Sequence, residues 1–221
     1  IMGIGWTDKN IAKEANNHII RATKEYPERI VGFCSVNPLW GDQATREIER
    51  CAGEGLIGIG ELHPDTQGLD ITNKRIMEPV MTPALALEIP VVIHSSEPVG
   101  HSYPGKGNTT PDKLIALINN FPENKIICAH WGGGLPFYAL MPEVNRDLKN
   151  VYFDTAASPF LYDQRIFNLV SSLTNPGRIL LASDYPLISH RRVSAQLDES
   201  SLDARQKSDI LGGNAKILLN L

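Results

Sequence analysis

Near the middle of the chain the sequence reads Pro90-Val91-Val92-Ile93-His94-Ser95-Ser96-Glu97-Pro98-Val99-Gly100-His101. A short β-branched run that stops at turn-forming residues is typical of a strand buried on both faces. His94 is the first polar side chain after this run, so it should lie at the carboxyl end of the strand. In α/β enzymes that end of the strands carries the chemistry. We therefore treat His94 as the first candidate site residue.

The same pattern occurs three more times in the chain. Apolar runs that begin at Leu56, Lys125 and Arg178 end on Glu61, His130 and Asp184. In a parallel barrel the carboxyl ends of the strands share one rim, so these side chains should meet His94 there. Imidazole and carboxylate groups bind Zn²⁺ and similar ions, and a catalytic site leaves one position open for water. A single histidine would more simply be a hydrogen-bonded strand-end residue, but four such ends in register favour a metal or catalytic site.

The spacing of the apolar runs predicts the fold class. Consecutive strand centres, taken as Val31, Ile57, Val92, Ile127, Tyr152 and Leu180, are 25 to 35 residues apart. Each interval accommodates one helix and two loops, which predicts an α/β fold with a parallel sheet and right-handed crossovers. Counting residues 1–5 gives about seven strands. We therefore expect a TIM (β/α)8 barrel in which the first strand and helix, a unit of about 30 residues, is missing, and a single domain over residues 1–221.

Helical periodicity fills the intervals between these strands. We expect a first helix that buries Ile11, Ala15 and Ile19, and a helix after Asn73 that Pro79 and Pro83 split or kink. The other expected helices lie at residues 42–51, 111–118, 136–148 and 163–172, and residues 203–221 should form two short helices around a Gly-Gly pair.

Composition excludes several functional classes. The 221 residues are 42% hydrophobic, carry a net charge of −4 and contain no run of Lys or Arg, which argues against nucleic acid or an anionic membrane as a partner. No stretch approaches the roughly 18 apolar residues of a membrane span. Cys34, Cys51 and Cys128 have no Cys-x-x-Cys spacing, so we expect buried, reduced thiols in a cytoplasmic protein. A small-molecule substrate suits this composition best.

Five motifs carry a resemblance to a known family. They are Gly58-Ile59-Gly60-Glu61-Leu62-His63-Pro64, Val92-Ile93-His94, Ala129-His130-Trp131-Gly132-Gly133, Leu181-Ala182-Ser183-Asp184-Tyr185-Pro186 and Ile210-Leu211-Gly212-Gly213-Asn214-Ala215. In this order they span essentially the whole chain and resemble the amidohydrolase superfamily. The most similar branch is amidohydrolase 2, which includes aminocarboxymuconate-semialdehyde decarboxylase and related hydrolases and decarboxylases.

The resemblance implies a metal-dependent TIM barrel, most simply with zinc. In such a protein His94 is a metal ligand, and His130 binds metal or polarises the substrate. Asp184 binds metal and moves the proton. Glu61, in a Gly-Glu context similar to TatD-type nucleases, either bridges two metals or supports a ligand through a hydrogen bond.

One family motif is absent. The His-x-His pair that ends the first strand of these proteins does not occur, because no two of the six histidines are two positions apart. We expect that a segment with this motif is missing from the chain, and that the chain as given binds metal weakly.

Several loop residues are candidates for substrate binding, because loops beyond the strand ends line the pocket in barrels. They are His63, His101, Tyr103 and Lys106, although a solvated loop lysine is the simpler interpretation of Lys106. The run Gly132-Gly133-Gly134 is better explained by close backbone approach than by phosphate binding, since no Gly-Lys-Ser/Thr follows it.

The expected function is hydrolysis of a small amide, ester or lactone by metal-activated water, with Asp184 as general base and His130 polarising the substrate. Non-oxidative decarboxylation at the same metal site is the first alternative. A metal-free, non-catalytic barrel is the second. An unfilled barrel seam would favour pairing with a second copy of the chain.

Overall fold

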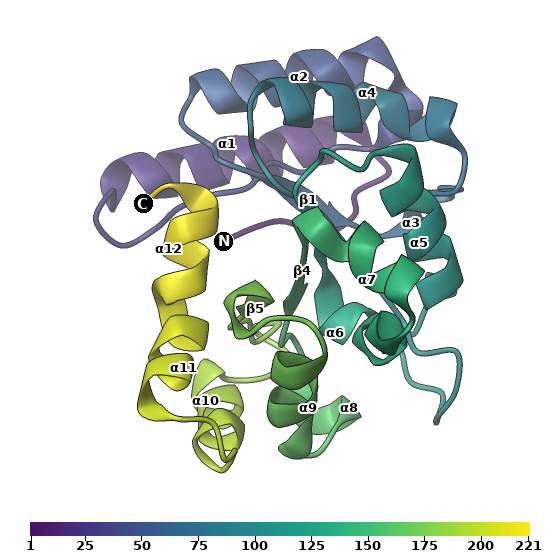
Figure 1. Ribbon diagram of the computed structural model, residues 1–221. Coiled ribbons are helices and arrows are strands. Elements are labelled where there is room, and N and C mark those ends of the chain that lie inside the picture. Colours follow the sequence, from purple (N-terminus) through teal and green to yellow (C-terminus); the bar gives the residue numbers. More distant parts are fainter.

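A computed structural model describes residues 1–221 and has a parallel sheet at its centre (Figure 1). Its five strands pair in the order β1-β2-β3-β4-β5, so each strand lies beside the next one in the chain. The strands are β1 (Ile59–Leu62), β2 (Val91–Ile93), β3 (Ile126–Cys128), β4 (Val151–Asp154) and β5 (Ile179–Leu180). Parallel order with helical connections is the arrangement that the spacing of the apolar runs predicts.

Two extended stretches continue this sheet beyond β1 and occupy the places of the other two expected strands. Cys34 pairs with Ile59 in a parallel bridge. The Phe33 N–H donates to the Ile1 carbonyl at 2.9 Å, so residues 1–5 run beside residues 31–35. The Glu61 N–H donates to the Gly3 carbonyl at 3.1 Å, which brings the first residues of the chain next to the end of β1.

Helices surround the strands, with α1, α2 and α4 in one layer above the sheet in the view of Figure 1. The α-helices are α1 (Lys9–Glu25), α2 (Asp42–Gly53), α3 (Pro64–Gln67), α4 (Lys74–Ala86), α5 (Pro111–Asn120), α6 (Ala129–Gly132), α7 (Pro142–Asp147), α8 (Ser158–Leu161), α9 (Arg165–Leu173), α10 (His190–Asp198), α11 (Ala204–Ser208) and α12 (Asn214–Leu219). The 3-10 turns are η1 (Pro38–Trp40), η2 (Leu135–Leu140), η3 (Leu148–Asn150) and η4 (Pro176–Arg178), and η5 (Asp209–Gly213) is a π-helical turn. None of the helices combines the length and apolar character that crossing a bilayer requires.

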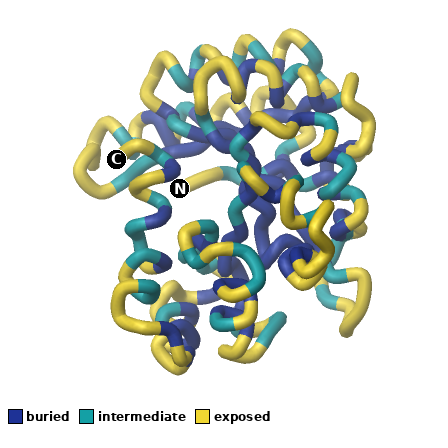
Figure 2. The backbone as a smooth tube through the Cα atoms, viewed as in Figure 1, coloured by how far each residue is buried: buried dark blue, intermediate teal, exposed yellow.

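The strands are buried, as the dark tube at the centre of Figure 2 shows, and apolar side chains pack on both of their faces. Alternate residues of each strand point to opposite sides. Val91 and Ile93 of β2 pack in the large core under the helices, whereas Val92 belongs to a smaller cluster. That smaller cluster contains Phe33, Val92, Ile127, Ala129, Leu180 and Leu218. Apolar contacts on both faces explain why the strands read as continuous hydrophobic runs in the sequence.

The helices differ from the expectation in three places. Helix α4 is not split at Pro79 or Pro83 but continues through both, and Met77, Val80 and Met81 on its inner face are fully buried. The single helix expected at residues 136–148 is instead η2 followed by α7, since Pro142 starts a new helix. Helix α10 was not expected at all.

The buried face of α1 also differs from the expectation. Ile11 is 50% exposed, and the buried residues are Ala12, Asn16, Ile19 and Ile20. The side-chain carbonyl of Asn16 accepts the Ser35 N–H at 2.7 Å, and its amide donates to the Ser35 carbonyl at 3.0 Å. A polar residue therefore occupies the inner face and ties α1 to the sheet, which hydrophobic periodicity could not predict.

Candidate metal centre

Three of the four expected strand-end residues form a close group. Glu61 lies in β1, His94 follows β2 and His130 follows β3, and one possible ligand atom from each lies within 4.8 Å of the other two. Both histidines are buried, at 8% and 7% exposure. The group arises because the three neighbouring parallel strands end at the same edge of the sheet.

Hydrogen bonds fix the geometry of this group. His94 Nδ1 lies 2.8 Å from Glu61 Oε1, and His94 Nε2 lies 3.1 Å from the Gly105 carbonyl oxygen. His130 Nε2 lies 3.7 Å from the same Glu61 oxygen. The rings of His94 and His130 meet edge to face with 4.8 Å between their centroids. Glu61 is therefore the shared partner of both histidines.

The shared carboxylate shifts the pKa values of its neighbours. Burial alone would raise the pKa of Glu61, but His130 and His94 hold it well below its usual range. Burial alone would lower the pKa of His130, but the Glu61 carboxylate and the charge of Asp154 raise it to about 9. At neutral pH the centre thus combines an ionised carboxylate with a protonated His130.

Asp154, at the end of β4, fixes the position of His130. This buried carboxylate accepts the N–H groups of His130 and Ala156 through Oδ1, both at 2.9 Å. His130 Nδ1 in turn donates to the Ala156 carbonyl at 3.1 Å. Because a carbonyl can only accept, Nδ1 carries the hydrogen, and Nε2 of the neutral ring is the atom available to a metal.

The backbone adopts uncommon conformations at the same rim. His130, Trp131 and Asp184 have φ angles of +54°, +57° and +65°, in the left-handed region that non-glycine residues rarely occupy. Gly133 allows a close approach, because a Cβ there would lie 2.4 Å from the Ser96 carbonyl oxygen. Trp131 is fully buried against Phe167, so it packs in the core rather than at the metal position.

Asp184 lies at the same cavity but outside the close group. A cavity of about 370 Å³ is lined by His94, His130 and Asp184 together with residues of the loop after β2 and of α8. Asp184 is exposed to this space, whereas both histidines are buried in its wall. A small aromatic molecule fits a cavity of this size.

The four expected loop residues have different positions. The His63 ring stacks on the His94 ring with 4.0 Å between their centroids, so His63 supports His94. The Nδ1 atom of His63 accepts the Thr66 N–H at 3.3 Å and so caps α3. His101 and Tyr103 line the cavity. Lys106 does not line it and donates to the carbonyls of Val99 and His101.

Two residues that the sequence did not single out contribute to this region. They are Asp154 and Glu97, the latter in the loop after β2. Asp154 is a polar residue at the end of an apolar run, as Glu61 and Asp184 are, so the pattern that identified those two residues could also have identified Asp154. Glu97 had no such signal, because only the folded loop shows what surrounds it.

The raised pKa of His130 makes metal binding depend on pH. Below a pH of about 9 a metal ion must displace the proton of His130, so affinity should rise by about tenfold per pH unit up to that value and then level off. Isothermal titration with Mn²⁺ or Zn²⁺ at several pH values measures this slope. A constant affinity between about pH 7 and 9 would show that the pKa of His130 is not raised in the metal-free protein.

Asp154→Asn should weaken metal binding without removing a ligand. An amide keeps the shape of the side chain but loses the charge that holds the two N–H groups, so we expect metal affinity to fall by about 10- to 100-fold. Titration calorimetry measures the loss. Asp198→Asn, an exposed change at the end of α10, is the matched control and should leave the affinity unchanged.

A parallel α/β sheet with a Glu-His-His group at the carboxyl ends of its strands is typical of metal-dependent enzymes of the α/β-barrel class. The chain matches the amidohydrolase family, Amidohydro_2, over residues 5–221. The protein therefore belongs to the amidohydrolase family, which confirms the resemblance and the TIM-barrel fold class expected from the sequence.

Individual relatives are distant in sequence and similar in fold. The chain is 22% identical over 252 residues to a gamma-resorcylate decarboxylase from Polaromonas, covering 95% of this chain and 76% of that protein. A putative amidohydrolase from Staphylococcus aureus superposes with a TM-score of 0.79 at 24% identity, covering 98% and 83% of the two chains. A 5-carboxyvanillate decarboxylase from Sphingomonas paucimobilis superposes with a TM-score of 0.80 at 19% identity, and the match covers 96% of this chain and 73% of that one. A dihydroxybenzoic acid decarboxylase from Polaromonas, solved with manganese and 2-nitroresorcinol, superposes with a TM-score of 0.75 at 20% identity. The match covers 95% of this chain and 75% of that one.

The residues of the centre fit a divalent cation. One carboxylate oxygen and two imidazole nitrogens are a donor set for Zn²⁺ or Mn²⁺. The Ala156 carbonyl accepts the Nδ1 hydrogen of His130, which is the supporting hydrogen bond that such a ligand needs. Glu61, His94 and His130 would hold the ion.

Proposed function

We propose that this protein removes the carboxyl group of a small aromatic acid as CO₂, without oxidation, at a divalent metal held by Glu61, His94 and His130. The observation that carries the proposal is that His94 and His130, which group closely with Glu61, line one cavity together with Asp184. Support comes from the similar proteins named as decarboxylases of hydroxylated aromatic acids. They favour the decarboxylase alternative over the hydrolysis that we expected first.

Glu61, His94 and His130 would hold the cation, which would supply a positive charge to bind and orient the acid group of the substrate. The donor set accepts zinc, which the resemblance implied, as well as manganese, which the similar decarboxylase contains. We propose manganese or zinc as the working ion, and loading with each in turn decides between them.

The chain's own residues orient the substrate and move the proton. The backbone at Asp184 aims its side chain into the cavity that His94 and His130 also line. In the proposed step Asp184 passes a proton to the ring carbon that bears the carboxylate. The bond to that carboxylate then breaks, its electron pair restores the aromatic ring, and CO₂ leaves. Asp184 is exposed and regains a proton from solvent.

The experiment is a product assay on the metal-loaded protein. We expect CO₂ and the matching phenol from acids such as 2,6-dihydroxybenzoate or 5-carboxyvanillate. Release of a new acid from an amide, ester or lactone, with no CO₂ from any aromatic acid, would instead support hydrolysis. Failure to bind either metal after reconstitution would support the metal-free barrel.

A further inference from the structure

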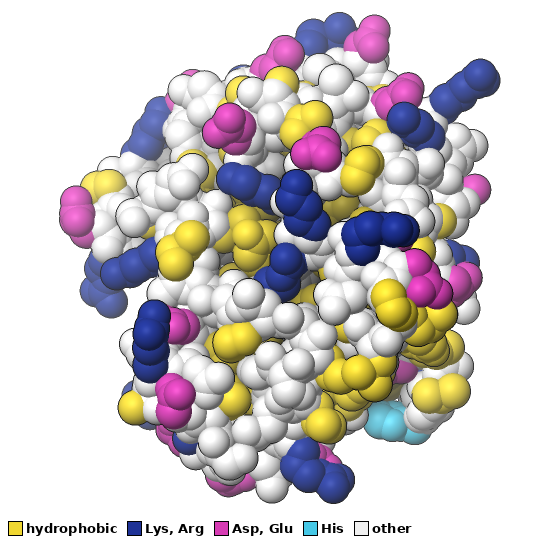
Figure 3. Space-filling model, in the orientation of Figure 1, with side chains coloured by type: hydrophobic (Ala, Val, Ile, Leu, Met, Phe, Trp, Pro, Cys, Tyr) yellow, Lys and Arg dark blue, Asp and Glu magenta, His cyan; other side chains and the backbone are white.

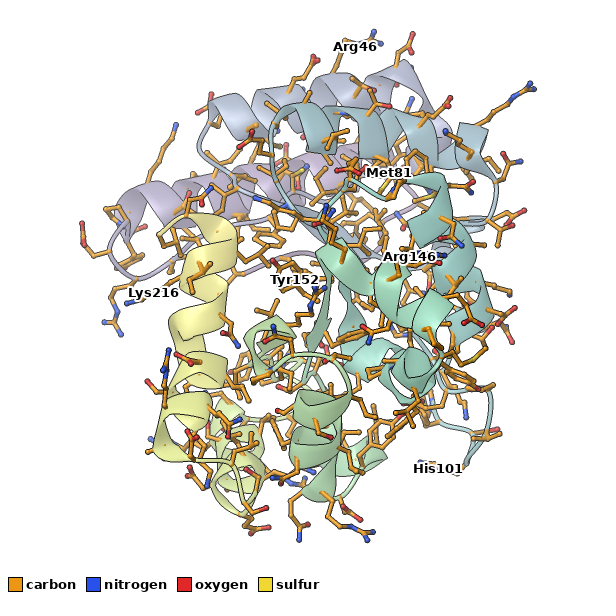
Figure 4. All side chains as sticks on the ribbon, in the orientation of Figure 1. Arg46, Met81, His101, Arg146, Tyr152 and Lys216 are labelled. Atoms are coloured by element: carbon orange, nitrogen blue, oxygen red, sulfur yellow. The ribbon has the colours of Figure 1, made fainter.

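A second cavity adjoins the one at the metal centre. It has a volume of about 300 Å³, and it shares His101, Tyr103 and Leu161 with the first. Its remaining wall includes the aromatic side chains of Phe137 and Tyr138. Figure 4 shows His101 on the loop after β2, and Figure 3 shows hydrophobic side chains gathered beside a histidine on this side of the molecule. A ligand larger than one ring could therefore occupy both cavities.

Glu97 contributes an unusual carboxylate to the second cavity. Its Oε2 accepts the hydroxyl hydrogen of Tyr103 at 3.1 Å. Its Oε1 is buried and has no hydrogen-bond partner of good geometry, and the Tyr162 hydroxyl is the other polar group beside this carboxylate. No Lys, Arg or His pairs with it. A buried carboxylate oxygen without a donor is unfavourable until some group donates to it. Because Tyr103 gives its only hydrogen to Glu97, the phenol oxygen can only accept from a ligand.

Lys106 supplies the opposite charge in the same wall. Its ammonium group donates to the carbonyl oxygens of Val99 at 2.7 Å and His101 at 3.1 Å, which leaves a third hydrogen without a protein acceptor. It lies 5.7 Å from the centre of the Tyr103 ring. The formal charges of Glu97 and Lys106 cancel, so the cavity suits a neutral group that both donates and accepts.

We propose that the second cavity binds an arm of the substrate that extends beyond the reacting ring and ends in a hydroxyl group. The hydroxyl donates to Glu97 and accepts from Lys106, and the apolar stem of the arm packs against Phe137, Tyr138 and Tyr162. Glu97 is then a specificity-determining residue. This inference rests on the proposed function, because it places the reacting ring in the cavity at the metal centre.

The test compares ligands that differ only in the arm. Titration calorimetry on the metal-loaded protein measures the binding of para-(hydroxyethyl)benzoate, para-propylbenzoate and para-(aminoethyl)benzoate, with unsubstituted benzoate as reference. We expect the hydroxyethyl compound to bind about tenfold tighter than the propyl compound, the value of one good hydrogen bond. Glu97→Leu should reduce this ratio to about one and leave benzoate binding unchanged. Lys106→Met should strengthen binding of the aminoethyl compound, because it removes a like charge.

Glu49→Leu, an exposed change on α2, is the matched control and should keep the wild-type ratio. If Glu97→Leu does not fold, Lys106→Met still tests the assignment. The assignment is overturned if the wild-type protein binds the hydroxyethyl and propyl compounds equally well. It is also overturned if neither variant changes the ratio of these two affinities.

A further comparison separates this inference from the proposed function. Phenylethanol and propylbenzene lack the carboxylate, so their binding to the second cavity does not depend on decarboxylation. A preference for phenylethanol that Glu97→Leu abolishes, in a protein that releases no CO₂, would leave the cavity assignment standing and remove the proposed function. Release of CO₂ from 2,6-dihydroxybenzoate, in a protein that shows no preference for the hydroxyl arm, would support the proposed function and remove the cavity assignment.

Discussion

Glu61→Gln is expected to weaken metal binding by about a hundredfold or more and to abolish measurable CO₂ release. Glu61 is the shared partner of His94 and His130, and glutamine keeps its shape while removing the negative charge that faces the cation. The same variant should lower the pKa of His130 from about 9, because burial then favours the neutral ring. Titration calorimetry measures the first effect, and an NMR titration of the metal-free protein measures the second.

The matched control for this change is Glu49→Gln, which alters an exposed glutamate on α2. It should leave both metal affinity and the pKa of His130 unchanged. If Glu61→Gln binds Mn²⁺ as tightly as the wild type does, Glu61 is not a ligand, and the three-residue centre is the wrong description.

Asp184→Asn is expected to reduce kcat by about a hundred- to ten-thousandfold, the usual contribution of a positioned acid or base. An amide cannot pass a proton to the ring carbon. Asp184 lies outside the close group of Glu61, His94 and His130, so metal affinity should change far less than kcat does. Steady-state kinetics and metal titration on the same preparation separate the two effects.

Asp163→Asn provides the control for Asp184, since it makes the same chemical change at an exposed residue. It should retain wild-type kcat. A loss of metal binding as large as the loss of kcat in Asp184→Asn would mean that Asp184 acts mainly as a ligand, as the family resemblance allows.

The sequence predicted the fold class because both faces of the strands are covered. Val91, Val92 and Ile93 are all buried, so the strand appears as an unbroken β-branched run with a polar residue at its end. The juxtaposition of Glu61, His94 and His130 was predictable for the same reason, since parallel neighbours end at one edge. The five-strand order follows the order of these runs along the chain.

What the sequence could not give depends on tertiary contacts. The hydrogen bond of the buried Asn16 places a different face of α1 against the sheet than its apolar residues predict. Helix α4 continues through Pro79 because its inner face is packed in the core. The hydrogen bonds that Asp154 accepts come from backbone groups, which leave no trace in residue identity. Glu97 belongs to the same class, because its partner Tyr103 lies in a loop that only folding brings back onto it.

The left-handed backbone at His130 and Asp184 has a consequence for how the centre assembles. These backbone conformations cost free energy, and the contacts around the rim offset that free energy when the protein folds. An arriving ion then finds the His130 ring already aimed and loses little chain entropy by ordering it. Preorganisation of this kind predicts that the metal-free and metal-loaded proteins have nearly superimposable backbones at the rim.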